Sequence, residues 1–138
     1  MQPGNLRDAD EWLVRAERDL LLADRALNEI PVLADGAVFL AQQAAEKAFK
    51  GFLAAHGRPI QKTHDLTQLV PDCVAIEPGF AQFQAIAPQL SAYVTQFRYP
   101  GGPLEPPEAE ARRAVEDARA IVAFVRQCVD ARPSAPTI

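Results

Sequence analysis

The sequence is organised around residues 39–55, FLAQQAAEKAFKGFLAA. On a helix of about 3.6 residues per turn, apolar side chains cover most of this segment's circumference. A helix that is apolar nearly all round is covered by neighbours on several sides. We therefore predict a central helix that closes at His56-Gly57, with Gly57 just beyond its end. Its broadest apolar arc consists of Val38, Ala41, Ala45, Phe49 and Phe52.

The same segment carries one narrow polar stripe, formed by Gln43, Glu46, Lys47 and Lys50. These positions are three, four and seven residues apart, so they share one side of a helix. Two interpretations remain open at this point. The stripe is either the solvated edge of a core helix, with Glu46 and Lys50 as a weak pair, or a working surface.

Helical patterns also precede and follow the central segment. Asp8 and Glu11 resemble a capping box that opens a first helix, which ends before Pro31,. Thr63 is a suitable N-cap for a short helix over residues 65–70, which Pro71 and Asp72 break or restart,. The first helix should face the core through Ala9, Leu13, Ala16, Leu20, Ala23 and Leu27.

A fourth pattern runs through residues 80–97 and contains Pro88, which predicts a kink or two consecutive helical pieces,. The last helix should begin near Pro106-Pro107, with Glu108 and Glu110 at its positive end,. No segment alternates apolar and polar residues as an exposed strand would. The sequence therefore predicts an all-α, up-and-down bundle of four to five helices.

Length and composition indicate one ordinary domain, residues 1–138, with a core over about 8–130 and a frayed tail over 131–138,. A net charge of −4 argues against non-specific coating of nucleic acid,. No apolar run approaches the roughly 20 residues of a membrane span, and no signal peptide is evident. We expect a cytoplasmic protein with no membrane association. Cys73 and Cys128 stand apart and are expected to be buried, reduced thiols,.

Metal and cofactor chemistry have no support in the residue spacing. His56 and His64 belong to no zinc-type or di-iron-type motif, and no glycine-rich phosphate loop is present,. We expect neither a metal nor a cofactor. Taken singly, the remaining polar groups have structural explanations. Gathered around one cleft, they would suit an anionic, aromatic ligand such as a nucleotide or an RNA end. The predicted nucleotide-binding residues are Lys47, Lys50, His64, Arg98 and Tyr99.

Four motifs, in this order, resemble the HEPN domain (higher eukaryotes and prokaryotes nucleotide-binding) of the stand-alone prokaryotic type. They are Trp12-x-x-x-Ala16, the run from Gln42 to Lys50, His64-Asp65-Leu66, and Arg98-Tyr99-Pro100. The resemblance implies a helical bundle that usually forms a homodimer. It also implies a binding or regulatory subunit that acts with a minimal nucleotidyltransferase in a toxin–antitoxin-type pair, with a nucleotide or RNA as ligand.

Many members of this family are metal-independent ribonucleases, with an Arg followed after four to six residues by a His. Arg98 matches the Arg, but Pro103, Leu104 and Glu105 occupy the positions where the His would fall. None of them can replace an imidazole that titrates near neutral pH. We therefore expect a protein that is not an enzyme. The alternatives are an RNA endonuclease toxin that uses Arg98 and His64, and a purely structural module for helical oligomerisation.

Overall fold

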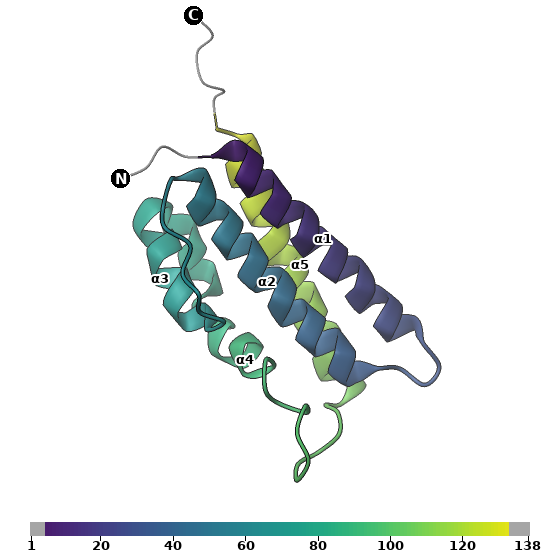
Figure 1. Cartoon of the computed structure of the whole chain (residues 1–138). Coiled ribbons are helices and arrows are strands. Elements are labelled where there is room, and N and C mark those ends of the chain that lie inside the picture. Colours follow the sequence, from purple (N-terminus) through teal and green to yellow (C-terminus); the bar gives the residue numbers. More distant parts are fainter. Residues whose placement is uncertain (1–4, 133–138) are drawn as a thin grey trace, which may run out of the picture.

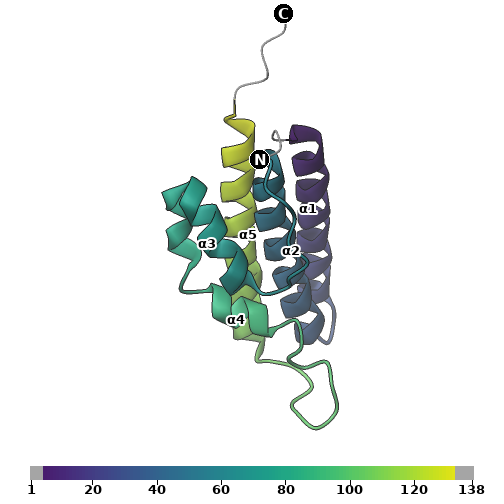
Figure 2. The same ribbon diagram turned by 60° about the vertical axis from the view of Figure 1, so that its left-hand side comes forward.

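The computed structural model describes residues 5–132, which form five α-helices and one short 3₁₀ helix and contain no strand. Three long helices dominate the bundle, and the shorter elements pack along one side of it (Figures 1 and 2). The predicted all-α bundle is confirmed. The elements in chain order are α1 (Leu6–Asn28), α2 (Ala34–Ala55), α3 (Leu66–Ile76), η1 (Pro78–Phe83), α4 (Ala87–Ala92) and α5 (Glu108–Asp130).

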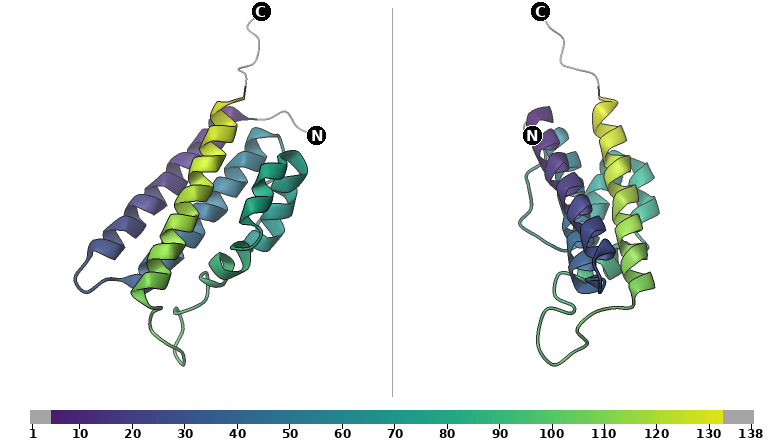
Figure 3. Two further views of the ribbon diagram at one scale, coloured as in Figure 1. Left: turned by 180° about the vertical axis from the view of Figure 1, so that it is seen from behind. Right: turned by 90° about the vertical axis from the view of Figure 1, so that its right-hand side faces the viewer.

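The central position predicted for residues 39–55 is confirmed, because α2 contacts α1, α3, α4 and α5. Seen from behind, α5 lies across α1 and α2, so it covers the side of α2 that faces away in Figure 1 (Figure 3). The predicted apolar arc of α2 is buried. Its many alanines allow neighbouring helix backbones to come close, as small side chains do.

Gly51 shows how close α1 and α2 approach each other. A Cβ atom added to Gly51 would lie 3.0 Å from Cβ of Trp12 and 3.3 Å from the backbone oxygen of Ala9. Any larger residue would push the two helices apart, because a packed interior has no spare volume there. The contact fixes the register in which Trp12 and the polar side of α2 face each other.

Two helix starts differ from the sequence prediction. Asn5, not Asp8, caps α1: its side chain accepts a hydrogen bond from the backbone N–H of Asp8. Asp65, not Thr63, caps α3 by accepting from the N–H of Thr67. In both helices the capping side chain lies two or three residues before the residue whose N–H donates to it. The tertiary contacts decide which of the possible capping side chains reaches that N–H.

The predicted break or restart at Pro71 and Asp72 is wrong, because α3 continues through both residues to Ile76. A proline inside a helix removes one backbone hydrogen bond, here the one that the carbonyl of Thr67 would accept. Both Thr67 and Pro71 are exposed, so water can solvate that carbonyl. The helical pattern over residues 80–97 forms two pieces, η1 and α4, with Pro88 at the start of α4. Two consecutive pieces were one of the two alternatives that the sequence predicted.

The end of α2 and the start of α5 carry the residue types expected at helix ends. Gly57 follows α2 with a φ of 68°, as expected for a residue that ends a helix,. Pro107 is the N-cap of α5, and Glu108 and Glu110 occupy its first turn,. Within the described residues, no helix is both long and apolar enough to span a membrane. Most of the predicted frayed tail, residues 133–138, lies outside the described residues, as do residues 1–4.

Candidate functional site

The carboxylate of Glu46 is the hub of a polar cluster on α2. Its Oε1 accepts hydrogen bonds from Nδ1 of His64 at 2.9 Å and from Nε2 of Gln42 at 3.2 Å. Its Oε2 accepts from Nζ of Lys50 at 3.0 Å. Gln42, Glu46 and Lys50 are buried, whereas the ring of His64 reaches the surface. We call these four residues, Gln42, Glu46, Lys50 and His64, the central polar cluster.

Glu46 remains ionised although it is surrounded by protein. Burial alone would raise its pKa, but the hydrogen bonds from Lys50, His64 and Gln42 together hold the pKa below its ordinary value,. A carboxylate can only accept hydrogen bonds, so Nδ1 of His64 must carry its proton. In the neutral imidazole, Nε2 is then an acceptor without a proton.

The backbone around His64 is held as firmly as its ring. The carbonyl of His64 accepts a hydrogen bond from Nε2 of Gln42 at 2.9 Å. The next two residues are tied to α4, because Ser91 Oγ donates to Asp65 at 3.1 Å and accepts from the N–H of Leu66 at 2.6 Å. The side chain of His64 is 65% exposed, yet hydrogen bonds to its ring and to its backbone hold it in one position. His64 is therefore a pre-organised surface residue.

The two lysines of the predicted stripe do not lie open to solvent, and this part of the prediction is corrected. Lys50 is only 5% exposed; its ammonium faces Glu46 and lies 5.9 Å from the ring centre of Trp12. Lys47 donates to Oδ2 of Asp19 on α1 at 2.6 Å. Lys50 is therefore neutralised by Glu46 on the same helix, and Lys47 by Asp19 of α1, which packs against this edge of α2,.

Arg98 and Tyr99 remain at the surface after the end of the fourth helical region. The guanidinium of Arg98 stacks on the ring of Phe39, near the start of α2, with Cζ 3.9 Å from the ring centre. The stacking fixes the plane of the guanidinium and leaves its N–H groups free to meet an anion. Tyr99, the next residue, is 69% exposed.

His64 and Arg98 meet the same side of α2, two helical turns apart. His64 contacts α2 at Glu46, and Arg98 contacts it at Phe39, seven residues earlier. At a rise of about 1.5 Å per residue, these anchors are about 10 Å apart along the helix. Figure 1 shows the segment between α2 and α3, residues 56–65, descending along α2. We call the surface that carries His64, Lys47, Arg98 and Tyr99 the α2 face.

Several residues that support this arrangement were not predicted from the sequence. Gln42, Asp19, Phe39 and Ser91 hold the predicted cations and the imidazole in place. Gln42 had a local signal, because a fully buried amide on an otherwise apolar arc must have partners,. The others had none: each contact joins residues that are distant in the sequence.

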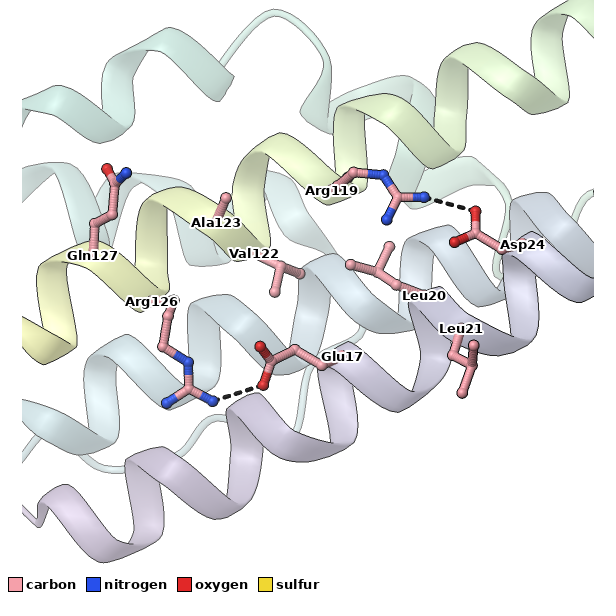
Figure 4. A pocket seen from close by; sticks show the side chains of 9 residues that line it. All are labelled: Glu17, Leu20, Leu21, Asp24, Arg119, Val122, Ala123, Arg126 and Gln127. Atoms are coloured by element: carbon pink, nitrogen blue, oxygen red, sulfur yellow. Dashed lines mark hydrogen bonds and ion pairs between the residues drawn. The ribbon is translucent and has the colours of Figure 1, made fainter.

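A cavity with a volume of about 580 Å³ lies elsewhere, between α1 and α5 (Figure 4). Leu20, Leu21, Val122 and Ala123 give it an apolar lining. Two ion pairs cross it, Arg126 to Glu17 at 2.6 Å and Arg119 to Asp24 at 2.6 Å. We call this region the α1–α5 groove. It contains none of the residues predicted to bind a nucleotide.

The remaining reactive side chains have structural roles. Cys73 is buried, as predicted, and burial raises the pKa of its thiol,. Cys128 is only half-buried, so the prediction of two buried thiols is half correct. Burial, together with Arg132 and Arg58, lowers the pKa of His56, whose ring packs on Phe52. In residues 5–132, no group of three or more His, Cys, Asp and Glu side chains could hold a metal ion.

These features define a helical-bundle domain with a polar cluster on its central helix and a basic, aromatic corner beside it. The family model of the HEPN domain matches residues 9–128, and the chain belongs to this family. Among solved structures, the crystal structure of TT1696 from Thermus thermophilus is similar: 31% of residues are identical and the TM-score is 0.71. The match covers 86% of this chain and 96% of TT1696. None of the curated proteins matches the chain. Family membership supports a function associated with nucleotides or RNA.

Proposed function

We propose that the protein is a dimeric, non-enzymatic HEPN subunit that binds a nucleotide or single-stranded RNA through the α2 face. The observation that carries this proposal is the exposed Arg98, whose guanidinium lies over the ring of Phe39. Such a guanidinium suits a phosphate, and the exposed ring of Tyr99 beside it suits a base,. His64 supplies a third polar contact on the same face.

The distribution of cations supports an anionic ligand on this face despite the net charge of −4. On the far side, three of the four arginines of α5, Arg112, Arg119 and Arg126, are paired with carboxylates. Within the described part of the chain, Arg98 forms no ion pair, and neither do Arg15 and Arg18 of α1 or Arg58 and Lys62 before His64. Unpaired cations raise the local concentration of an anion and release counterions when it binds.

Titration of the purified protein with labelled single-stranded RNA and with nucleotides tests ligand binding. Arg98→Ala should weaken binding of RNA and reduce the slope of log affinity against log salt by about 0.7, as expected for one lost phosphate contact with a single strand. Arg113→Ala on α5 is the matched control, because it removes an exposed arginine on another helix. Absence of binding, or equal effects of the two variants, would contradict the proposal.

The proposed homodimer uses the same face. Large apolar side chains stay exposed around it: Leu22 lies three residues after Asp19 on α1, Ile60 lies in the segment before His64, and Tyr99 follows Arg98. A second copy would cover these groups and enclose the ligand between two α2 faces. Light scattering should therefore give twice the chain mass of 15.0 kDa.

Two adjacent leucines of α1 offer a matched test of the dimer surface. Leu22 is 44% exposed and borders the α2 face, whereas Leu21 is 48% exposed and lines the α1–α5 groove. Leu22→Asp should produce a monomer, and Leu21→Asp should leave the dimer intact. The opposite result would place the interface at the groove.

The minimal nucleotidyltransferase partner and the toxin–antitoxin role belong to the same proposal and are supported by the family resemblance. Co-expression of the chain with the nucleotidyltransferase encoded nearest to it should yield a complex that survives gel filtration. Expression of the chain alone should slow growth, and co-expression should restore it. A neighbouring gene without such a product, or growth unaffected by the chain, would contradict this part.

A second candidate is a metal-independent RNA endonuclease, which the contact between Glu46 and His64 favours. A carboxylate that fixes an imidazole gives it the orientation of a general base,. Nε2 would take the proton of a ribose 2′-hydroxyl, O2′ would attack phosphorus, and the 5′-oxygen would leave with a proton from water. Cleavage of RNA in EDTA that His64→Ala abolishes would favour this candidate, and intact RNA under excess protein would exclude it.

A further inference from the structure

The central polar cluster fixes more than the position of His64; it also fixes which ring nitrogen can accept a hydrogen bond. Nδ1 lies 2.9 Å from Oε1 of Glu46, an atom that can only accept,. The proton of the neutral ring is therefore on Nδ1, and Nε2 is left with a free lone pair. With the side chain 65% exposed, this lone pair is available to a ligand.

On the same face, every other predicted contact is a hydrogen-bond donor or an aromatic ring. Arg98 has only donors, and it suits phosphate oxygens,. Nε2 of His64 needs the opposite partner, a donor group on the ligand. Of the groups that a nucleotide backbone offers, the ribose 2′-hydroxyl is a donor, and DNA lacks it.

We propose that His64, positioned by Glu46, recognises the 2′-hydroxyl of a ribose, so that the α2 face selects RNA or ribonucleotides over their deoxy equivalents. This inference rests on the proposed binding function and names the sugar that the site requires. His64 is the specificity residue in this scheme, and Glu46 is a positioning residue that acts through it.

The construction of the cluster supports a functional role. A buried carboxylate–ammonium pair is a poor source of stability, since desolvation opposes the attraction, and apolar residues of similar size could replace it. Here Lys50 neutralises Glu46, Gln42 orients both the carboxylate and the carbonyl of His64, and Ser91 anchors the following residues. All of these contacts converge on the placement of one exposed ring.

The test compares three single-stranded oligonucleotides of one base sequence: RNA, 2′-O-methyl RNA and DNA. At about pH 8, where an ordinary imidazole is neutral, the wild-type protein should bind RNA about three- to tenfold more tightly than the other two, the range that one net hydrogen bond supplies. His64→Ala should bind all three equally. Arg98→Ala should weaken all three by the same factor.

Glu46→Gln distinguishes a role of Glu46 in positioning His64 from a role in maintaining the fold. An amide can accept from or donate to Nδ1, so it no longer dictates the tautomer. The preference for RNA should fall, while circular dichroism stays that of the wild type. The ¹⁵N chemical shifts of His64 should show the Nδ1–H tautomer in the wild type and a mixture in Glu46→Gln.

Two failures are distinguishable. Equal wild-type affinity for RNA, 2′-O-methyl RNA and DNA, or an Nε2–H tautomer in the spectrum, would overturn the inference and leave the proposed binding function standing. Absence of binding to all three oligonucleotides would overturn the proposed function itself, and the inference with it.

Discussion

The central polar cluster and the α1–α5 groove both pair carboxylates with cations, but they differ in what surrounds the charges. In the cluster, the side chains of Glu46 and Lys50 are 6% and 7% exposed. In the groove, Arg126 and Arg119 reach their partners across an open apolar surface (Figure 4). Water and salt screen the second set of charges and barely reach the first. Ion pairs between the same kinds of side chain can therefore hold a functional side chain in position in one region and contribute little to stability in another.

The largest expected effect comes from Glu46→Ala, because it leaves the ammonium of Lys50 buried without a counter-charge. The free energy of unfolding should fall by about 3 kcal/mol, as when one partner of a buried pair is removed. Urea denaturation at neutral pH measures this loss. Glu46→Leu combined with Lys50→Met removes both charges and should recover most of it. A loss below about 1 kcal/mol would make the cluster equivalent to a surface pair.

The next prediction concerns pH. The pKa of Glu46 in the folded protein lies below its ordinary value of 4.5, so the unfolded chain binds more protons on acidification,. The stability that the ionised carboxylate contributes is fully present above 4.5 and is lost as the pH falls through the folded pKa. The difference in unfolding free energy between wild type and Glu46→Gln should therefore shrink in acid. A constant difference from neutral pH into strong acid would contradict this.

A smaller effect is expected at Asp65, which links His64 to α3. Its carboxylate caps the helix by accepting from the N–H and the hydroxyl of Thr67, and these hydrogen bonds lower its pKa. Asp65→Ala should lower the free energy of unfolding by about 1 kcal/mol, the usual cost of losing an N-cap. Asp65→Asn keeps the acceptor and should retain most of the stability. If both variants behave alike, the cap is not what holds the start of α3.

The smallest effects belong to the α1–α5 groove. Arg126→Ala breaks contacts with Asp10 and Glu17, and Arg119→Ala breaks one with Asp24. Each change should cost between about 0.2 and 1 kcal/mol, and high salt should reduce the cost further. Denaturation curves at low and high salt measure both. A salt-independent loss as large as that of Glu46→Ala would remove the distinction between the two regions.

The fold was largely predictable from the sequence, because the spacing of apolar residues along the chain shows which side of a helix is buried. The central role of α2, the apolar arc that includes Phe49, and the end at Gly57 all follow from spacing and local backbone preference,. The errors occur at helix boundaries, where more than one residue could cap or end the helix. Asn5 replaced Asp8 as a cap, and α3 continued past Pro71 because the carbonyl it frees is exposed.

For the candidate site, the sequence by itself determined the chemistry and the tertiary structure decided the accessibility. The residue types and motifs pointed to His64, Arg98 and Tyr99, and all three are at the surface. The pair of Glu46 and Lys50 follows from their spacing on α2, but only the packing of α1 on α2 buries it and supplies Asp19 as the partner of Lys47. The physical reason is that the energy of a charge depends on the dielectric and the partners around it, which distant segments supply, whereas helix periodicity is a property of neighbouring residues alone.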